Sequence, residues 1–334
     1  DRISFMNFDL TKQQIELRER VRDFAEREVR PVAAYNDENE IFDVELTRKM
    51  ADLGLLGICV PKAYGGQELD TLSYIIAVEE LSRVDGSTAA TIAADNSLGI
   101  SPIKEYGTKE QKEKYLPLLC KTHLWGFGLT EETAGCDSRG TKSTARLEDD
   151  KWVLNGTKIF ITNSATPMTL RSTVQVVSGE KNGKPEFTTF LMENDTPGFT
   201  QEPMNRKMMW RASNTGRLTF NNVELTNDNM LGAPGQGSHI MLATLDGGRL
   251  SIAAMALGCA QGAYEMALAY SKEREQFGKQ ICKFQAVSFK LADMAMKIEA
   301  ARCLLYKACR IKDAGMPFGK EAAIIAGLTE AAGD

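Results

Sequence analysis

Histidine is scarce in this chain: among 334 residues there are only His123 and His239. Neither stands in an H-E-x-x-H or E-x-x-H spacing, the arrangements that place metal ligands together on a helix in zinc and di-iron sites. The sequence therefore predicts no metal site. A helical bundle formed by this chain is not expected to hold a di-iron centre.

The seven cysteines form no C-x-x-C pair, their number is odd and their spacings are scattered. A disulfide framework would need an even and regular set, so reduced thiols in a cytosol-like compartment are the better interpretation. The cysteines are Cys59, Cys120, Cys136, Cys259, Cys282, Cys303 and Cys309.

A long hydrophobic run is also missing. The uncharged stretch Leu250–Tyr264 contains Gln261 and falls short of the roughly 20 residues that span a bilayer, so we expect no membrane segment. No secretory signal or Arg-rich leader opens the chain. The net charge of -5 argues against nucleic acid as a partner, although a local positive patch for a small anionic ligand stays open.

What is present is a chain with 43% hydrophobic and 25% charged residues, which is typical of globular proteins. The first part has helical periodicity. Thr11 and Gln14 have the spacing of a capping box, Pro31 is expected to end the first helix, and Gly57 and Gly86 are placed as later helix stops.

The pattern changes near Trp125 to β-branched and aromatic alternation. Asn155-Gly156 between two apolar runs predicts a hairpin turn. Further strands are expected in the stretches 172–179, 186–194 and 216–225. This part is predicted to be a small antiparallel β domain.

Helical periodicity returns at Gly235, and residues 284–315 predict one long amphipathic helix with an apolar stripe that is most simply bundle core. The stripe is Val287, Leu291, Met294, Ile298, Ala301 and Leu305. We therefore predict an α+β fold with three domains: a helical domain (1–123), a middle β domain (124–231) and a C-terminal helical bundle (232–334) that looks truncated.

A Gly-rich stretch, "GFGLTEETAGCDSRGT", opens the β domain at Gly126. Its amides and threonine hydroxyls could bind a flat heterocycle or a phosphate, but such a loop is more often only a turn. It is followed in order by "LNGTKIFITN", "MMWRASNT", "LDGGR", "EREQFGKQICKFQ" and "FKLADM". In this order the chain resembles the acyl-CoA dehydrogenase family, whose three domains use FAD to introduce a double bond into an acyl-CoA thioester.

The resemblance implies a set of flavin-binding residues. The backbone of Phe127, Leu129 and Thr130 would face the flavin pyrimidine. Thr130 and Thr162 would hydrogen-bond the ring near its reactive nitrogen, and Phe160 would pack on the isoalloxazine. Without the motif order, Thr162 and Phe160 could equally be strand residues of the core.

Two further sets follow from the same resemblance. Arg274, Phe277 and Gln285 would hold the adenosine diphosphate half of FAD across a dimer interface. Asp246 and Arg249 would line the channel for the CoA thioester. The alternative for the two arginines is a solvated surface charge, as for most arginines.

The loop departs from the family pattern at two positions. Cys136 stands where Ser is usual, near the flavin diphosphate and the substrate side, and a thiol is the weaker hydrogen-bond donor. Glu132 replaces the usual Pro.

The family's base is a glutamate, which removes a proton next to the thioester carbonyl while hydride leaves to flavin N5. Its two usual positions are a late C-terminal turn, which would come after Asp334, and the residue that is Gly248 here. One hypothesis is that a tail beyond this sequence carries the glutamate and the enzyme dehydrogenates short straight-chain acyl-CoA.

The second hypothesis gives the role of base to Asp95, in "AADNSLG". From the floor of an acyl pocket it would act on far carbons, as in a 1,4-type elimination on cyclohex-1-ene-1-carboxyl-CoA. The alternative for Asp95 is a helix cap or turn, where Asp is favoured. A catalytically inactive flavin- and acyl-CoA-binding subunit, or an oxidase or nitroalkane-oxidising relative, stays open as well.

The resemblance also implies partners: an acyl-CoA substrate, an electron-transferring flavoprotein as electron acceptor and a homotetramer. We expect a cytoplasmic bacterial enzyme, or a mitochondrial matrix enzyme whose leader has been removed.

Overall fold

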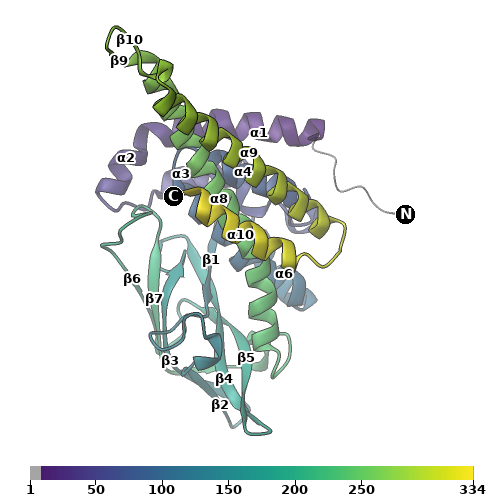
Figure 1. Cartoon of the computed structure of the whole chain (residues 1–334). Helices are drawn as coiled ribbons and strands as arrows, with labels where there is room; N and C mark the ends of the chain where they lie inside the picture. The colour runs from purple at the N-terminus through teal and green to yellow at the C-terminus, as the bar shows by residue number, and fades with distance from the viewer. Residues whose placement is uncertain (1–8, 334) are drawn as a thin grey trace. The chain divides into compact units, whose positions relative to one another are not determined.

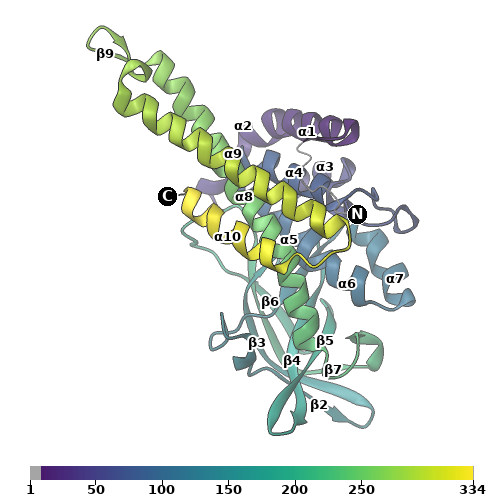
Figure 2. The same cartoon turned by 45° about the vertical axis from the view of Figure 1, so that its right-hand side comes forward.

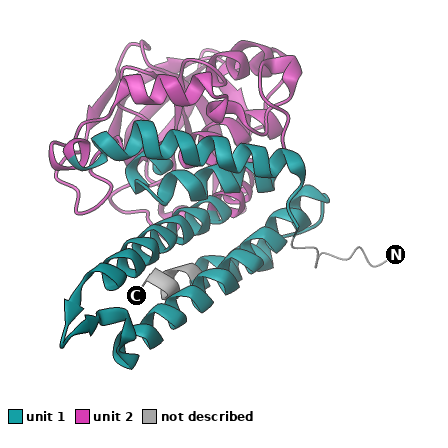
Figure 3. Cartoon of the chain, turned by 90° about the horizontal axis from the view of Figure 1, so that it is seen from above, with its two compact units in different colours: residues 1–34, 70–90, 249–334 teal, residues 35–69, 91–248 magenta. Residues whose placement is uncertain are grey.

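The computed structural model describes residues 9–333, and side chains up to residue 328. The chain forms two compact units, shown in different colours in Figure 3. One holds the residues up to 34, 70–90 and those from 249 onwards, and the other holds 35–69 and 91–248. The fold is α+β, as the sequence predicts, because the first unit is helical and the second carries a large sheet.

The helices and strands of the described residues are labelled in Figures 1 and 2. The α-helices are α1 (Lys12–Phe24), α2 (Arg30–Glu38), α3 (Val44–Asp52), α4 (Thr71–Ser82), α5 (Gly86–Ala94), α6 (Ser101–Tyr106), α7 (Lys109–Leu119), α8 (Gly237–Glu273), α9 (Gln285–Asp313) and α10 (Gly319–Gly333). The strands are β1 (Leu124–Gly128), β2 (Thr144–Glu148), β3 (Lys151–Thr162), β4 (Thr169–Lys181), β5 (Lys184–Glu193), β6 (Phe199–Pro203), β7 (Thr215–Leu225), β8 (Met230–Leu231), β9 (Glu275–Gln276) and β10 (Lys279–Gln280).

The start of α1 confirms the predicted capping box. The Gln14 amide donates to the Thr11 hydroxyl at 3.2 Å, and the Thr11 amide donates to the Gln14 side chain at 3.0 Å. The expected stop at Pro31 is wrong. A π-helical turn (Ala25–Val29) joins α1 to α2 without a break, and Pro31 lies inside this continuous helical run, just after the π turn.

Gly86 is likewise not a stop. Helix α4 already ends at Ser82, and Gly86 is the first residue of α5. The Asp85 carboxylate accepts the amides of Ser87 and Thr88, which caps the new helix. The sequence thus predicts a helix break in this region, but it assigns Gly86 to the end of the first helix, whereas Gly86 begins the next one.

The glycines in the uncharged stretch of α8 allow this helix to pack closely against the backbone of residues 79–83. A Cβ on Gly258 would lie 2.3 Å from the Glu79 carbonyl oxygen, and one on Gly262 would lie 2.1 Å from that of Arg83. By length and composition alone, α8 is the one described helix that could cross a membrane. A core helix passes the same test, and 56% of its apolar window is buried.

The long helix predicted at residues 284–315 is α9, and the lower part of its stripe is buried at Ile298, Ala301 and Leu305. In Figures 1 and 2 the short β9–β10 hairpin joins the end of α8 to the start of α9. This hairpin matters because it carries residues that the family resemblance assigns to FAD.

The second unit contains an eight-stranded sheet in the order β6-β7-β3-β2-β4-β5-β8, with β1 paired to β4. The prediction of an antiparallel domain is wrong in part, since β1 pairs parallel with β4 and β2 also meets β4 in parallel. Strands that no short turn connects can pair in either direction, and alternation does not show which. The first strand begins at Leu124 and the sheet ends at Leu231; the three domain boundaries stay predictions.

The predicted hairpin at Asn155-Gly156 is also wrong. Both residues lie inside β3, at a bulge between Leu154 and Gly156. The turn between β2 and β3 is made by Asp149 and Asp150, which both have positive φ. Gly156 is needed for another reason: its φ is 143° and a Cβ there would lie 2.2 Å from the Ser143 hydroxyl oxygen.

Candidate active site

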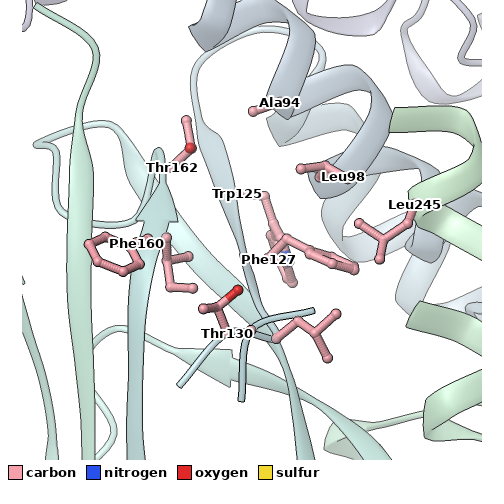
Figure 4. A pocket seen from close by; sticks show the side chains of 11 residues that line it. Ala94, Leu98, Trp125, Phe127, Thr130, Phe160, Thr162 and Leu245 are labelled. Carbon is pink, nitrogen blue, oxygen red and sulfur yellow. The ribbon is translucent and has the colours of Figure 1, made fainter. Parts of the chain in front are cut away.

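A pocket of about 220 Å³ lies in the second unit, between the helical run that begins with α5 and the strands β1 and β3 (Figure 4). Five of the residues that the family resemblance assigns to the flavin ring line it together: Phe127, Leu129, Thr130, Phe160 and Thr162. The other lining residues are Ala94, Leu98, Trp125, Gly135, Ile161 and Leu245. No ionisable side chain stands among them.

Two hydroxyl groups face this apolar cavity. Neither the Thr130 nor the Thr162 hydroxyl has a hydrogen-bond partner within the described residues. Leu129, Leu98 and Leu245 provide apolar walls. A flat ring with polar atoms along one edge would satisfy both hydroxyls and cover the apolar surface.

Phe160 is held in a strained conformation at the edge of the pocket. Its φ is 61°, and it falls where the pairing of β3 with β7 shifts between Lys158 and Ile161. The ring is 61% exposed. An aromatic residue with positive φ costs free energy and is often retained for function, here to present a ring to the pocket.

Directly beside the pocket, the sheet buries an ion pair. Lys158 of β3 is fully buried, and its ammonium donates to the Glu131 carboxylate at 2.7 Å and to the Leu129 carbonyl at 3.2 Å. Glu131 also accepts the amides of Lys142, at 2.6 Å, and Ser143, at 3.1 Å. The pair therefore ties the loop after β1 to β3 and to the start of β2.

The two charges support each other. Burial alone would raise the pKa of Glu131, but the Lys158 ammonium and the two backbone amides hold that pKa below its ordinary value. Burial lowers the pKa of Lys158, and Glu131 partly restores it. Each charge thus offsets part of the cost of burying the other.

Asp95 has the opposite surroundings. It is fully buried, its Oδ1 accepts the Trp125 amide at 3.2 Å, and its Oδ2 has no partner among the described residues. Burial raises its pKa well above the ordinary range, against a small lowering by the Trp125 amide. Its neighbours Ala94 and Leu98 line the pocket, whereas Asp95 does not.

The alternative that Asp95 caps a helix or makes a turn is wrong. It opens a π-helical segment (Asp95–Ile100) inside an unbroken helical run from α5 to α6. Such π segments widen a helix and often occur at functional sites.

The other predicted residues lie outside the pocket lining. Cys136 is exposed in the loop after β1, and Asp246 is half-buried on α8. Arg249, Arg274, Phe277 and Gln285 are exposed residues of the helical unit, and the Phe277 ring is 94% exposed at the β9–β10 turn. No group of three or more His, Cys, Asp or Glu side chains suited to a metal occurs in the described residues.

The sequence patterns do not single out Lys158 and Glu131, although both stand in the motifs that carry the resemblance. The signal was available: Lys158 is a single charge beside the apolar run "IFI", as Asp95 is a single charge in "TIAADNSLGI". A charge in such a run has to be paired or neutralised.

Comparison with known proteins agrees along the whole chain. Three family models match: acyl-CoA dehydrogenase N-terminal domain at residues 11–123, middle domain at 126–223 and C-terminal domain at 235–328. The short-chain specific acyl-CoA dehydrogenase of Clostridium acetobutylicum is 46% identical over 95% of this chain and 84% of its own length.

Solved structures give the same result. Butyryl-CoA dehydrogenase from Megasphaera elsdenii has a TM-score of 0.94 and 43% identity, over 98% of this chain and 86% of that one. A chain from a study of the electron transferring flavoprotein of Acidaminococcus fermentans has a TM-score of 0.94 and 44% identity, also over 98% and 86%.

An apolar pocket with two unpartnered hydroxyls, in an α+β fold with this order of motifs, is typical of a flavin-dependent oxidoreductase. The chain belongs to the acyl-CoA dehydrogenase family. It is an FAD-dependent enzyme that acts on a CH–CH bond of an acyl-CoA.

The described residues fit the cofactor. The isoalloxazine ring needs an apolar bed and hydrogen-bond donors along one edge, and the pocket offers the leucines, the Phe160 ring and two unpartnered hydroxyls. When bound, FAD supplies the hydride acceptor. The protein's own contribution is to orient the ring and keep water away from it.

Proposed function

We propose that this protein catalyses the α,β-dehydrogenation of a short, straight-chain acyl-CoA. The observation that carries the proposal is the apolar pocket with the Thr130 and Thr162 hydroxyls at its wall. The short-chain and butyryl-CoA specificity printed for the relatives supports the choice of substrate.

The side chains have separate tasks in this proposal. Thr130 and Thr162 fix the orientation of the flavin ring, and Phe160 covers it and excludes water. Asp246 and Arg249 line the thioester channel, and Cys136 lies near the diphosphate and the substrate. Hydrogen bonds to the thioester oxygen stabilise the enolate-like charge as the α-proton leaves.

The base is the part that the pocket does not contain. None of its lining side chains can accept a proton at neutral pH, and Asp95 is turned toward the Trp125 amide. We therefore assign the α-proton to a glutamate of a C-terminal segment beyond residue 334.

A second candidate keeps Asp95 as the base. Its carboxyl is buried with a raised pKa on the same helical run that supplies Ala94 and Leu98 to the pocket. A carboxylate in that place would suit a 1,4-type elimination on cyclohex-1-ene-1-carboxyl-CoA.

The partners are part of the proposal. An electron-transferring flavoprotein would take the electrons, which the match to the Acidaminococcus fermentans chain supports. The almost fully exposed Phe277 supports a homotetramer in which Arg274, Phe277 and Gln285 hold the adenosine diphosphate half of FAD in a neighbouring subunit. A bacterial cytoplasmic location fits the bacterial relatives.

An anaerobic titration of the FAD-loaded protein tests the proposal. Loss of flavin absorbance with butyryl-CoA supports straight-chain dehydrogenation. Loss only with cyclohex-1-ene-1-carboxyl-CoA selects Asp95 chemistry instead, and the Asp95→Asn variant should then stay oxidised. A flavin that stays yellow with both thioesters overturns both candidates and points to an inactive binding subunit.

A further inference from the structure

We propose that Lys158 is a positioning residue for the flavin. It would act through the Leu129–Thr130 peptide, with Glu131 as its counter-ion, and would set both the affinity for FAD and the flavin reduction potential. This rests on FAD occupying the pocket of Figure 4, but not on the identity of the acyl-CoA.

The two peptide groups that flank Thr130 are each held by a residue of β3. The Lys158 ammonium donates to the Leu129 carbonyl at 3.2 Å, and the Ile159 amide donates to the next carbonyl, that of Thr130, at 2.9 Å. Leu129 and Thr130 both line the pocket. Two neighbouring residues of β3 therefore fix the backbone that faces the ring.

The Leu129–Thr130 peptide carries the Thr130 N–H. A cation bonded to a peptide oxygen withdraws electron density from that peptide, so its N–H becomes a stronger donor, in the way that linked hydrogen bonds strengthen one another. Within residues 9–333, no protein acceptor takes the Thr130 N–H. This donor is thus available to a polar edge of the flavin.

Glu131 keeps the arrangement electrically neutral. Its carboxylate lies 2.7 Å from Lys158 and accepts two backbone amides, so the charge of Lys158 is balanced inside the sheet. Gly128 lies beside the pair, and a Cβ there would lie 2.8 Å from a Val174 methyl, so the glycine allows the close packing of β1 on β4.

Stability alone does not explain such a pair. Taking two charges out of water costs more than their attraction returns in many proteins, and apolar replacements of both partners are often as stable or more so. If Glu131 were replaced as well, Met or Leu at position 158 would match the apolar residues around it in β3. The carbonyl contact to a pocket residue gives the pair a second role.

Two single variants separate the roles. Lys158→Met leaves the Glu131 charge near the ring, and we expect a lower flavin midpoint potential and an affinity for FAD weaker by about tenfold or more. Glu131→Gln leaves the Lys158 charge, and we expect the potential to rise, because a cation stabilises the electron-rich reduced flavin. Lys158→Arg should restore part of the affinity.

The measurements are the FAD dissociation constant of the apoprotein, the midpoint potential by reductive titration, and thermal unfolding of the apoprotein. None of them needs an acyl-CoA, so they hold even if the substrate proposal fails. Lys151→Met is the matched control. Lys151 lies on the same strand as Lys158, and the change removes an exposed ion pair with Glu224 of β7.

Opposite shifts of the potential in Lys158→Met and Glu131→Gln support the proposal. Lower thermal stability with an unchanged potential in both variants would overturn it, since that is the result of a structural pair. If Lys158→Met does not fold, Glu131→Gln still decides it: a potential equal to wild type in that variant would reject the role.

Discussion

Two buried carboxylates in the same compact unit have pKa values that are shifted in opposite directions. Glu131 is paired with Lys158 and two backbone amides, and its pKa lies below the ordinary value. Asp95 receives one backbone amide, has an oxygen without a partner among the described residues, and its pKa is well above the ordinary value.

The difference shows what burial does when compensation is present or missing. Around Glu131, fixed donors keep the charge, so the charge can organise a loop. Around Asp95, burial with a single backbone donor favours the neutral form over the charged one, which raises the pKa of the carboxyl. Of the two carboxylates, Glu131 therefore has the compensated charge.

The largest effect is expected for Lys158→Met. This variant leaves Glu131 charged, buried and without its cation, and we expect a loss of about 3–5 kcal/mol in the free energy of unfolding at pH 7. Urea unfolding of the FAD-free protein measures it. Lys151→Met should be nearly silent, because that ion pair is exposed. Equal losses in both variants would mean that the buried pair has no special weight.

Asp95→Asn should act in the opposite direction. The folded-state pKa of Asp95 is raised, so its contribution to stability is complete below about pH 4, the ordinary value, and is lost as pH rises through the folded-state pKa. We expect the variant to lack this fall, because an amide has no proton to lose, and to exceed wild type at pH 8–9 by about 1.4 kcal/mol for each pH unit over which the folded state alone keeps the proton.

Unfolding curves from pH 4 to pH 9 measure this difference. Within residues 9–333, the Cys120 thiol interacts with Asp95, but its pKa is raised to about 12, so it stays neutral over that range. Asp149→Asn, at an exposed turn, is the control and should keep the wild-type slope. A parallel slope in wild type and Asp95→Asn would show that Asp95 does not titrate there.

Most of the architecture and the ring pocket could be predicted from the sequence. The Thr11 cap and the long helix at Gln285 follow from local patterns, which a sequence displays directly. That Phe127, Thr130 and Thr162 share one cavity was expected only from the family resemblance, which the order of the motifs carries.

The errors concern contacts between distant residues. Asn155-Gly156 has hairpin chemistry, yet its glycine serves a close approach of Ser143 within a bulge. Sequence also could not show that Lys158 meets a carboxylate while Asp95 meets only an amide, because each partner is decided by the packing of another element.

A smaller effect is expected for Gly99→Ala, which crowds the Asp95 region. The new Cβ would lie 2.9 Å from the Trp125 Cβ and 3.3 Å from the Asp95 Oδ1. Overpacking usually costs about 1–3 kcal/mol, but alanine gains about 1 kcal/mol in a helix, so we expect a net loss near 1 kcal/mol. Urea unfolding measures it. A stabilised variant would show that Asp95 and Trp125 can separate freely.

The smallest effect is expected at Cys120, whose thiol pKa is influenced by Asp95. Burial is the main cause that raises the pKa of its thiol to about 12, and Asp95 adds to it. Its thiolate at pH 8 is therefore rarer by roughly a thousandfold than that of an ordinary cysteine, and we expect no maleimide labelling while exposed Cys136 reacts.

Because burial dominates, Asp95→Asn should leave Cys120 unlabelled. Peptide mapping after timed quenching measures both sites. If Cys120 in this variant reacted as fast as Cys136, the hydrogen bond from the Trp125 amide to Asp95 would be what holds the helical run against β1. Asp95 would then have a role in packing.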